Sequence, residues 1–292
     1  MRHYREYFIK IILFFFALSS LIFLAGIVIV LFLEGLPIFG EVSILEFILG
    51  RDWYPSYTPP DYGILPLISA SMLVTLGAMI ISIPLGISSA ICIACILPPS
   101  LKNTIKPLVE LLAGIPSVIY GLFGMRILGP FLSRLLNLPT GLTALNASIM
   151  LGIMALPTIL SLSEDAISSV PNKYRDASLA LGCTGWETIY KIVLPSASSG
   201  IFTAIILGMG RAIGETMTVL MVAGGATLIP RSFLEPVRPM TAAIAADMGE
   251  TPVGSNHYHA LFGIGILLFL ITLFLNIMAD LIAQRFKREV KN

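Results

Sequence analysis

The sequence predicts an all-α membrane protein with about six transmembrane helices. Hydrophobic residues make up 56% of its 292 positions and charged residues only 12%, whereas soluble domains carry about 25% charged residues. So little charge cannot cover a surface that faces water. The apolar runs are also continuous on all sides, which is typical of helices that lie in lipid.

The first of these helices is predicted at residues 11–33, after a basic cytoplasmic N-terminus at 1–10. A basic start followed by an apolar run is also the pattern of a cleavable signal peptide. The apolar part of such a peptide is only about 7–15 residues long and precedes a site of small residues. This run is longer and ends at Glu34-Gly35-Leu36-Pro37, so we expect a helix that stays in the membrane.

Five further apolar runs have the roughly 20 residues that a bilayer crossing requires. They cover about 66–97, 107–130, 141–162, 196–224 and 260–282. The long connections at 34–65 and 225–259 then share one side of the membrane, and those at 98–106 and 163–195 share the other side with both chain ends. We expect an outer loop at 34–65 and one transmembrane domain over 66–292.

The distribution of Lys and Arg predicts the orientation. The side of the chain ends carries twelve basic residues, and the opposite side carries four (Arg51, Arg134, Arg231 and Arg238). Cytoplasmic loops are enriched in basic residues, so both termini are predicted in the cytoplasm. The twelve residues are Arg2, Arg5, Lys10, Lys102, Lys106, Lys173, Arg175, Lys191, Arg285, Lys287, Arg288 and Lys291.

The connection at 163–195 is predicted to form two short helices. Pro171 suits a first helical turn, the helix 172–181 follows it, and Gly182 is a typical stop. Thr184 and Glu187 then form a capping box for a second short helix that ends near Leu194-Pro195. Such an elbow can rest on a soluble partner and pass its movement to the membrane helices. A well-capped connector without a partner is the alternative.

Arg211 and Glu215 are charged residues inside the fifth predicted span, where a charge costs at least about 2.5–3.5 kcal/mol. Residues four apart share a helix face, so we expect the two side chains to pair. The pair either locks two helices together or faces a route on which Arg211 meets an anion, since guanidinium suits phosphate. Arg126, near the outer end of the third span, is a weaker candidate, because its side chain can also extend to the interface.

Other classes of function find no support in the sequence. No G-x-x-x-x-G-K-[ST] loop is present to hold phosphates of ATP, and no nucleophile–base set suggests an enzyme. Three cysteines are too few for a disulfide framework, and no cluster of metal-ligating residues or basic nucleic-acid patch is found. We expect no cofactor and no metal in this chain.

The elbow resembles the EAA loop of ABC importer permeases, whose pattern is E-A-A-x3-G-x9-I-x-L-P. Here Asp176-Ala177-Ser178, Gly182 and Ile192-Val193-Leu194-Pro195 keep the spacing, with Asp for Glu and Ser for Ala. The resemblance implies a type I permease fold with cytoplasmic coupling helices. It also implies that the elbow contacts an ATPase subunit that carries the ATP and Mg, through Asp176, Ala177, Ser178, Gly182, Leu194 and Pro195.

A second resemblance is to the permeases of phosphate ABC importers, and within them to the PstC type. It rests on Gly210–Thr216 with Met221–Gly224, Gly114–Gly124, Thr241–Glu250 and Glu34–Pro37. It implies that this chain forms half of a pathway for inorganic phosphate and that Arg211 and Glu215 take part in its passage. The implied partners are a PstA-type permease, two ATP-binding subunits and an external phosphate-binding protein.

Two alternatives remain open. The first is the same machine for another oxyanion, such as sulfate or molybdate, which the pair of Arg211 and Glu215 does not exclude. The second is an ion-coupled carrier or channel that works alone, which predicts inverted repeats or a series of pore-lining polar residues. The sequence displays neither feature. A role in signalling external phosphate can coexist with transport, and the sequence does not address it.

Overall fold

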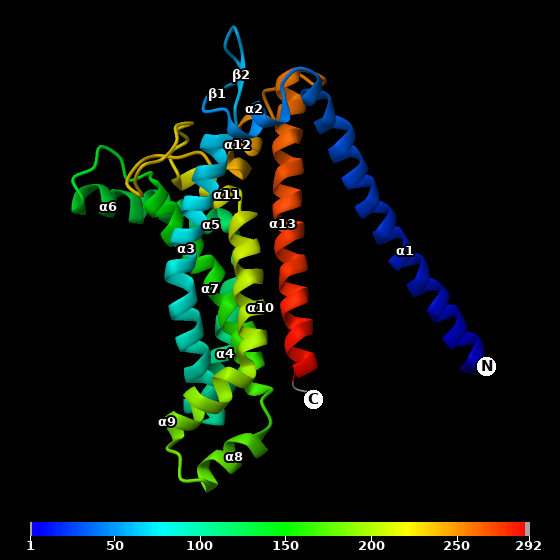
Figure 1. Ribbon diagram of the computed structural model, residues 1–292, viewed down its shortest axis with the longest axis vertical. Coiled ribbons are helices and arrows are strands. Elements are labelled where there is room, and N and C mark those ends of the chain that lie inside the picture. Colours follow the sequence, from blue (N-terminus) through cyan, green and yellow to red (C-terminus); the bar gives the residue numbers. More distant parts are fainter. Residues whose placement is uncertain (1, 290–292) are drawn as a thin grey trace.

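The computed structural model describes the backbone of residues 2–289 and the side chains of that range except 2–6, 8, 283 and 285–289. It is mostly helical (Figure 1). The long helices are α1 (Arg2–Gly35), α3 (Leu65–Ile91), α4 (Pro99–Ala113), α7 (Ala144–Ser168), α10 (Leu194–Ile213) and α13 (Asn256–Glu289). The shorter ones are α2 (Ile44–Leu49), α5 (Ser117–Phe123), α6 (Gly129–Leu135), α8 (Asn172–Ala180), α9 (Gly185–Thr188), α11 (Met217–Val222) and α12 (Met240–Asp247).

Short irregular elements complete the chain. One is a 3-10 turn, η1 (Leu36–Gly40), and three are π-helical turns, η2 (Cys92–Ile96), η3 (Gly124–Leu128) and η4 (Ile189–Val193). The strands β1 (Trp53–Tyr54) and β2 (Asp61–Tyr62) form an antiparallel hairpin that pairs Trp53 with Tyr62. This hairpin lies at one end of the molecule and α8 and α9 lie at the other (Figure 1). We call these the hairpin end and the elbow end.

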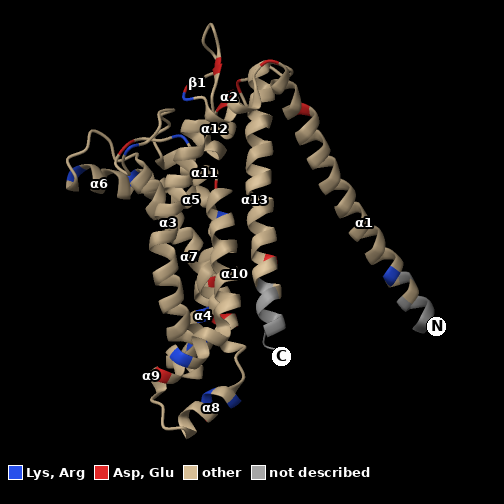
Figure 2. Ribbon diagram, in the orientation of Figure 1, with Lys and Arg blue, Asp and Glu red and all other residues tan. Residues whose placement is uncertain are grey.

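The prediction of six membrane spans is confirmed. Among the described residues, six helical segments are long and apolar enough to cross a membrane. The segments are Ile9–Gly40, Leu65–Ile96, Ser117–Leu135, Ala144–Ser168, Gly185–Ile213 and Asn256–Ile282. The start of α1 and the end of α13 both lie toward the elbow end (Figure 1). The charged residues gather mainly at the two ends of the bundle (Figure 2), but the side chains of Arg2, Arg5, Arg285, Lys287, Arg288 and Lys291 lie outside the described part.

The bundle is built around α7, of which 61% of the most apolar stretch is buried, the largest share among the six segments. Helices α3 and α10 pack against it. A Cβ atom at Gly208 would lie 2.5 Å from Ile159, so this glycine lets α10 approach α7 closely. Helix α1 leans away from the bundle and contacts α13 and η1 (Figure 1). Its apolar stretch is 0% buried, which suits a surface for lipid or for another membrane subunit.

The third span differs from the prediction of one helix over 107–130. Helix α4 ends at Ala113, the chain turns through Gly114–Pro116, and α5 begins at Ser117. Pro116 explains the break because proline has no N–H and disfavours the helical conformation of the residue before it. The helix then continues through η3 into α6, which runs crosswise to α7 (Figure 1). Glu110 therefore lies near the end of α4, just before this break.

The fourth and fifth spans also have different bounds. Helix α7 extends to Ser168 instead of ending near 162, so Glu164 lies within it. The second short helix of the elbow does not end at Leu194-Pro195, because α9, η4 and α10 are continuous. Pro195 lies just after the π-helical turn η4, and its missing N–H removes one hydrogen bond from this continuous helix. At its other end α10 stops at Ile213, instead of continuing to 224, and α11 starts only at Met217.

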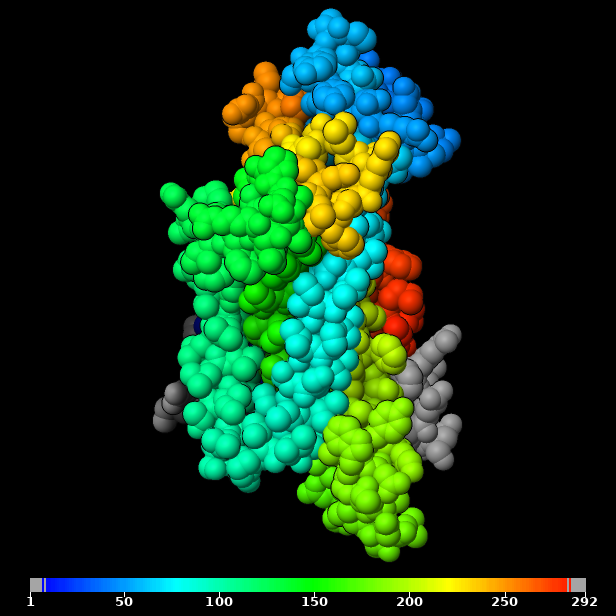
Figure 3. All heavy atoms as spheres, turned by 90° about the vertical axis from the view of Figure 1, so that its left-hand side faces the viewer, coloured from blue at the N-terminus to red at the C-terminus, as the bar shows by residue number. Residues whose placement is uncertain are grey.

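The segments before α3 and before α13 pack together at the hairpin end. Ile38, Phe47, Trp53, Ile64 and Leu261 are nearly or fully buried in one cluster. The space-filling view shows the hairpin segment in blue and the segment around 225–255 in yellow and orange at the same end (Figure 3). The elbow protrudes in yellow-green at the opposite end (Figure 3).

Candidate functional site

Arg211 bridges two neighbouring helices through uncharged acceptors. Its Nη1 donates to the Thr158 hydroxyl at 3.1 Å and its Nη2 donates to the Ala113 carbonyl at 3.1 Å. Thr158 lies near the middle of α7, and Ala113 is the last residue of α4. No carboxylate pairs with Arg211 among the described side chains, and the residue is exposed on the surface of this chain. Its positive charge is therefore held in place but not neutralised.

Glu215 does not pair with Arg211, which corrects the expectation of an ion pair on one helix face. Helix α10 ends at Ile213, so Glu215 lies in the break before α11 rather than one helical turn beyond Arg211. Its Oε1 accepts from the backbone N–H of Thr218 at 3.2 Å, and its carbonyl accepts from the Thr241 hydroxyl at 2.8 Å. Glu215 thus supports the start of α11, facing a small pocket that Ser71 and Thr75 also line.

Further polar contacts follow the face between α4 and α7. Toward the elbow end from Arg211, the Ser161 hydroxyl donates to Glu110 at 3.3 Å. Beyond it, Lys102 and Lys106 of α4 each approach the carboxylate of Glu164 to 2.6 Å. The Ser168 hydroxyl also donates to this carboxylate, at 2.5 Å. Glu164 is fully buried and its carboxylate is balanced by two lysines.

The sequence interpretation missed Thr158 and Glu164. A signal for them was present, because Thr158, Ser161, Asp165 and Ser168 recur at helical spacing, with Glu164 beside them. This spacing indicates a polar stripe on α7. It does not indicate that α4 covers the stripe, since the contacts join segments about fifty to sixty-six positions apart in the chain.

The elbow has the local structure that its sequence predicts. Gly182 has a φ of +86°, which a glycine adopts without strain, and it ends α8. Thr184 and Glu187 form the predicted capping box at the start of α9. Asp176, Ala177 and Gly182 are exposed, Leu194 is half-buried and Pro195 is exposed. Ser178 is buried instead, and its hydroxyl lies 3.0 Å from that of Thr188, so it joins α8 to α9.

Large apolar side chains are exposed at the elbow. Leu181 is 86% exposed, Tyr190 68% and Trp186 65%. Exposed apolar groups that gather in one place mark interaction surfaces. The elbow is therefore a candidate docking surface.

Arg126 does not join Arg211. It is exposed in η3, on the part of the third span that leads into α6. Among the described side chains, none of the other predicted site residues lies within hydrogen-bond distance of Arg126.

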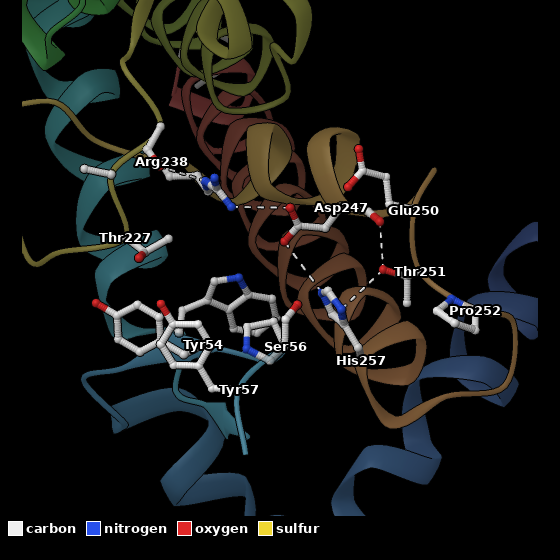
Figure 4. Close-up of a pocket in the computed structure, with 14 residues that line it drawn as sticks. Tyr54, Ser56, Tyr57, Thr227, Arg238, Asp247, Glu250, Thr251, Pro252 and His257 are labelled. Carbon is white, nitrogen blue, oxygen red and sulfur yellow. Dashed lines mark hydrogen bonds and ion pairs between the residues drawn. The ribbon is translucent and has the colours of Figure 1, made fainter. Parts of the chain in front are cut away.

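A cavity of about 480 Å³ opens at the hairpin end, between the hairpin and the segments 225–238 and 247–257 (Figure 4). Tyr54 and Tyr57 are stacked on one side, with ring centroids 5.1 Å apart. Asp247 lies between Arg238 at 3.3 Å and His257 at 3.6 Å (Figure 4). Burial raises the pKa of Asp247, but the nearby His257 and the charge of Arg238 outweigh this, so its pKa lies below the usual value.

Fold and site together define a multi-pass membrane protein with exposed apolar side chains at its elbow. A family model for the inner membrane component of binding-protein-dependent transport systems matches residues 82–291. The probable ABC transporter permease YqgH of Bacillus subtilis is 38% identical over 93% of this chain and 89% of its own length. The phosphate transport permease PstC of Mesorhizobium japonicum is 33% identical over 92% of this chain and 87% of its own.

Solved structures agree on the fold. A bacterial alginate ABC transporter permease superposes with a TM-score of 0.66 over 96% of this chain and 95% of its own, at 14% identity. The MetNI methionine ABC transporter gives a TM-score of 0.56 over 77% of this chain and 94% of its own, at 19% identity. The chain belongs to the family of binding-protein-dependent transport system inner membrane components. It is a multi-pass membrane protein with the fold of an ABC importer permease.

Proposed function

We propose that this chain is the PstC-type permease subunit of an inorganic phosphate importer and forms half of its pathway. The observation that carries the proposal is Arg211, a guanidinium near the middle of the bundle that no carboxylate neutralises among the described side chains. Phosphate transport is the activity named for relatives such as the PstC protein of Mesorhizobium japonicum. A cation at this depth is costly unless an ion or a water-filled route compensates it.

Arg211 contacts phosphate in this proposal through the N–H groups that Thr158 and Ala113 do not occupy. A planar guanidinium has five donors, of which two have partners here. The two neutral acceptors fix the orientation of the guanidinium and place no negative charge beside it that would compete with phosphate. Glu215 contributes through the break between α10 and α11, where it supports α11, and not by neutralising Arg211.

The proposed assembly pairs this chain with a PstA-type permease, two ATP-binding subunits that hold ATP and Mg, and an external phosphate-binding protein. The exposed apolar side chains Leu181, Trp186 and Tyr190 support docking of an ATP-binding subunit at the elbow. The elbow end then lies in the cytoplasm together with both termini. ATP binding moves the elbow, the pathway opens outward, and phosphate passes Arg211 on the return.

Two alternatives predict different results. Another oxyanion, such as sulfate or molybdate, fits the same guanidinium, and the phosphate permeases among the relatives favour phosphate. An ion-coupled carrier that works alone is disfavoured because the family consists of binding-protein-dependent systems. Such a carrier would purify from membranes without an ATP-binding subunit.

Uptake of labelled phosphate and sulfate tests the proposal in cells that depend on this importer. Arg211→Ala is expected to lower phosphate uptake about a hundredfold, because phosphate in transit loses two charged hydrogen bonds from the guanidinium, of about 1.5 kcal/mol each. Arg134→Ala, on the exposed face of α6, is the matched control and should retain uptake. Normal phosphate uptake by an assembled Arg211→Ala complex would remove Arg211 from the pathway, and preferential uptake of sulfate would identify the other substrate.

A further inference from the structure

Helices α4 and α7 are joined by polar contacts at three levels. Nearest the elbow, Lys102 and Lys106 bind Glu164. At the next level Ser161 binds Glu110, and at the last level Arg211 binds both Thr158 and the Ala113 carbonyl. We call this row of contacts the polar seam. It comprises Lys102, Lys106, Glu110 and Ala113 of α4, Thr158, Ser161, Glu164 and Ser168 of α7, and Arg211 at its end.

Glu164 is the strongest point of the polar seam. Its side chain is 0% exposed, both of its oxygens lie 2.6 Å from a lysine, and the Ser168 hydroxyl donates to it. A buried charge that loses its partner is strongly unfavourable. Any sliding of α4 along α7 would separate Glu164 from the two lysines, so this contact fixes the register of the two helices.

The elbow contacts the next turn of α7. Arg175 of α8 donates from Nη2 to the Ile167 carbonyl at 3.2 Å. Ile167 is buried and lies one helical turn beyond Glu164. Movement of α8 therefore acts on the part of α7 that holds α4.

The other end of the polar seam determines where Arg211 points. Its Nη1 is bound to α7 and its Nη2 is bound to the last residue of α4. Because one guanidinium spans both helices, a change in their register displaces one of its two acceptors. Arg211 thus responds to the relative position of α4 and α7.

We propose that Glu164 is a positioning residue that keeps α4 in register with α7 and thereby transmits elbow movement to Arg211. The inference rests on the proposed function, and it adds a route between the docking surface and the pathway residue. In the absence of this anchor the elbow still moves, but Arg211 no longer changes its position in step with it. ATP hydrolysis then continues while less phosphate is carried for each ATP.

The test uses the complete importer in proteoliposomes with its external binding protein, and it measures phosphate carried and ATP hydrolysed. Glu164→Gln preserves the size of the side chain and removes its charge. We expect this complex to assemble and to hydrolyse ATP, with the ratio of phosphate to ATP lowered roughly tenfold or more. A purely structural role would instead lower both activities together and leave their ratio unchanged, a result that overturns the inference.

Asp165→Asn is the matched control, because Asp165 also binds Lys106 but is largely exposed. It should change the ratio less than about twofold, and a loss equal to that of Glu164→Gln would refute a special role for the buried carboxylate. If Glu164→Gln prevents assembly, Lys106→Met decides, since it should assemble and lower the ratio in the same direction. An unchanged ratio in Lys106→Met contradicts the inference. Arg211→Ala is measured in the same assay. Normal phosphate transport by Arg211→Ala means that the proposed function fails. Loss of transport in Arg211→Ala together with an unchanged ratio in Lys106→Met means that only the inference about Glu164 fails.

Discussion

Arg211 and Glu164 both carry a charge within membrane-spanning helices, and the surroundings of the two charges differ. Glu164 is buried and its charge is balanced by two lysines of the same chain, so it can hold α4 against α7 but has no free charge for an ion. Arg211 is exposed and has two uncharged acceptors, so its charge remains available to an ion. A charged residue in an apolar run is thus a candidate for direct contact with a transported ion only when its own chain leaves the charge uncompensated.

Asp247 is a third case, since it joins α12 to Arg238 and to His257 of α13. Because its pKa in the folded protein is lowered, its contribution to stability is complete above the usual pKa of 3.8 and is lost as the pH falls through the lower folded value. Asp247→Asn should therefore destabilise the complex by about 1–3 kcal/mol at pH 7. The difference from the parent protein should persist to about pH 4 and shrink below it.

Thermal unfolding at a series of pH values measures this difference. Glu250→Gln is the control, because Glu250 lines the same cavity and makes no ion pair among the described side chains. A difference between Asp247→Asn and the parent that already disappears between pH 7 and pH 5 would show that Asp247 is not the titrating group.

The elements differ in how far local sequence determines them. The turn of the elbow was predicted nearly residue by residue, because its stop at Gly182 and its capping box at Thr184 act within a few positions. The predicted end of the second helix near Leu194-Pro195 was wrong. The breaks at 114–116 and 214–216 were missed because hydropathy continues through them. Pro116 was a usable signal for the first break. The second depends on contacts from Thr218 and Thr241 that only the folded chain brings to Glu215.

The contact between Ser178 and Thr188 gives a prediction for the elbow as an element. Ser178→Ala leaves the buried Thr188 hydroxyl without its partner, which costs about 1–3 kcal/mol. Adding Thr188→Val removes the unsatisfied hydroxyl, so the double variant should recover most of this loss. Hydrogen exchange of the amides of α8 should be faster in Ser178→Ala and close to the parent rate in the double variant. Equal exchange in all three proteins would mean that this contact does not hold α8 to α9.

For the whole molecule, composition determined the class, because a chain with so few charges has to be covered by lipid, and the separate apolar runs determined the number of spans. The identity of Arg211 as a candidate also followed from sequence, as a charge in an apolar run. Its partners Thr158 and Ala113 did not, since they lie 53 and 98 positions away in the chain. Long-range pairing of polar groups leaves no local pattern, so the polar seam required the folded chain.

Orientation is the last property of the whole molecule that the twelve-to-four distribution of basic residues predicts. Tyr57, 66% exposed at the hairpin end, and Leu181, 86% exposed at the elbow, are suitable probes. In a chain whose Cys92, Cys95 and Cys183 are replaced by alanine, a maleimide that does not cross membranes should label Tyr57→Cys in intact cells and leave Leu181→Cys unlabelled. Inside-out vesicles without ATP-binding subunits should give the opposite result. Labelling of Leu181→Cys in intact cells would place the elbow outside, where no ATP-binding subunit can reach it.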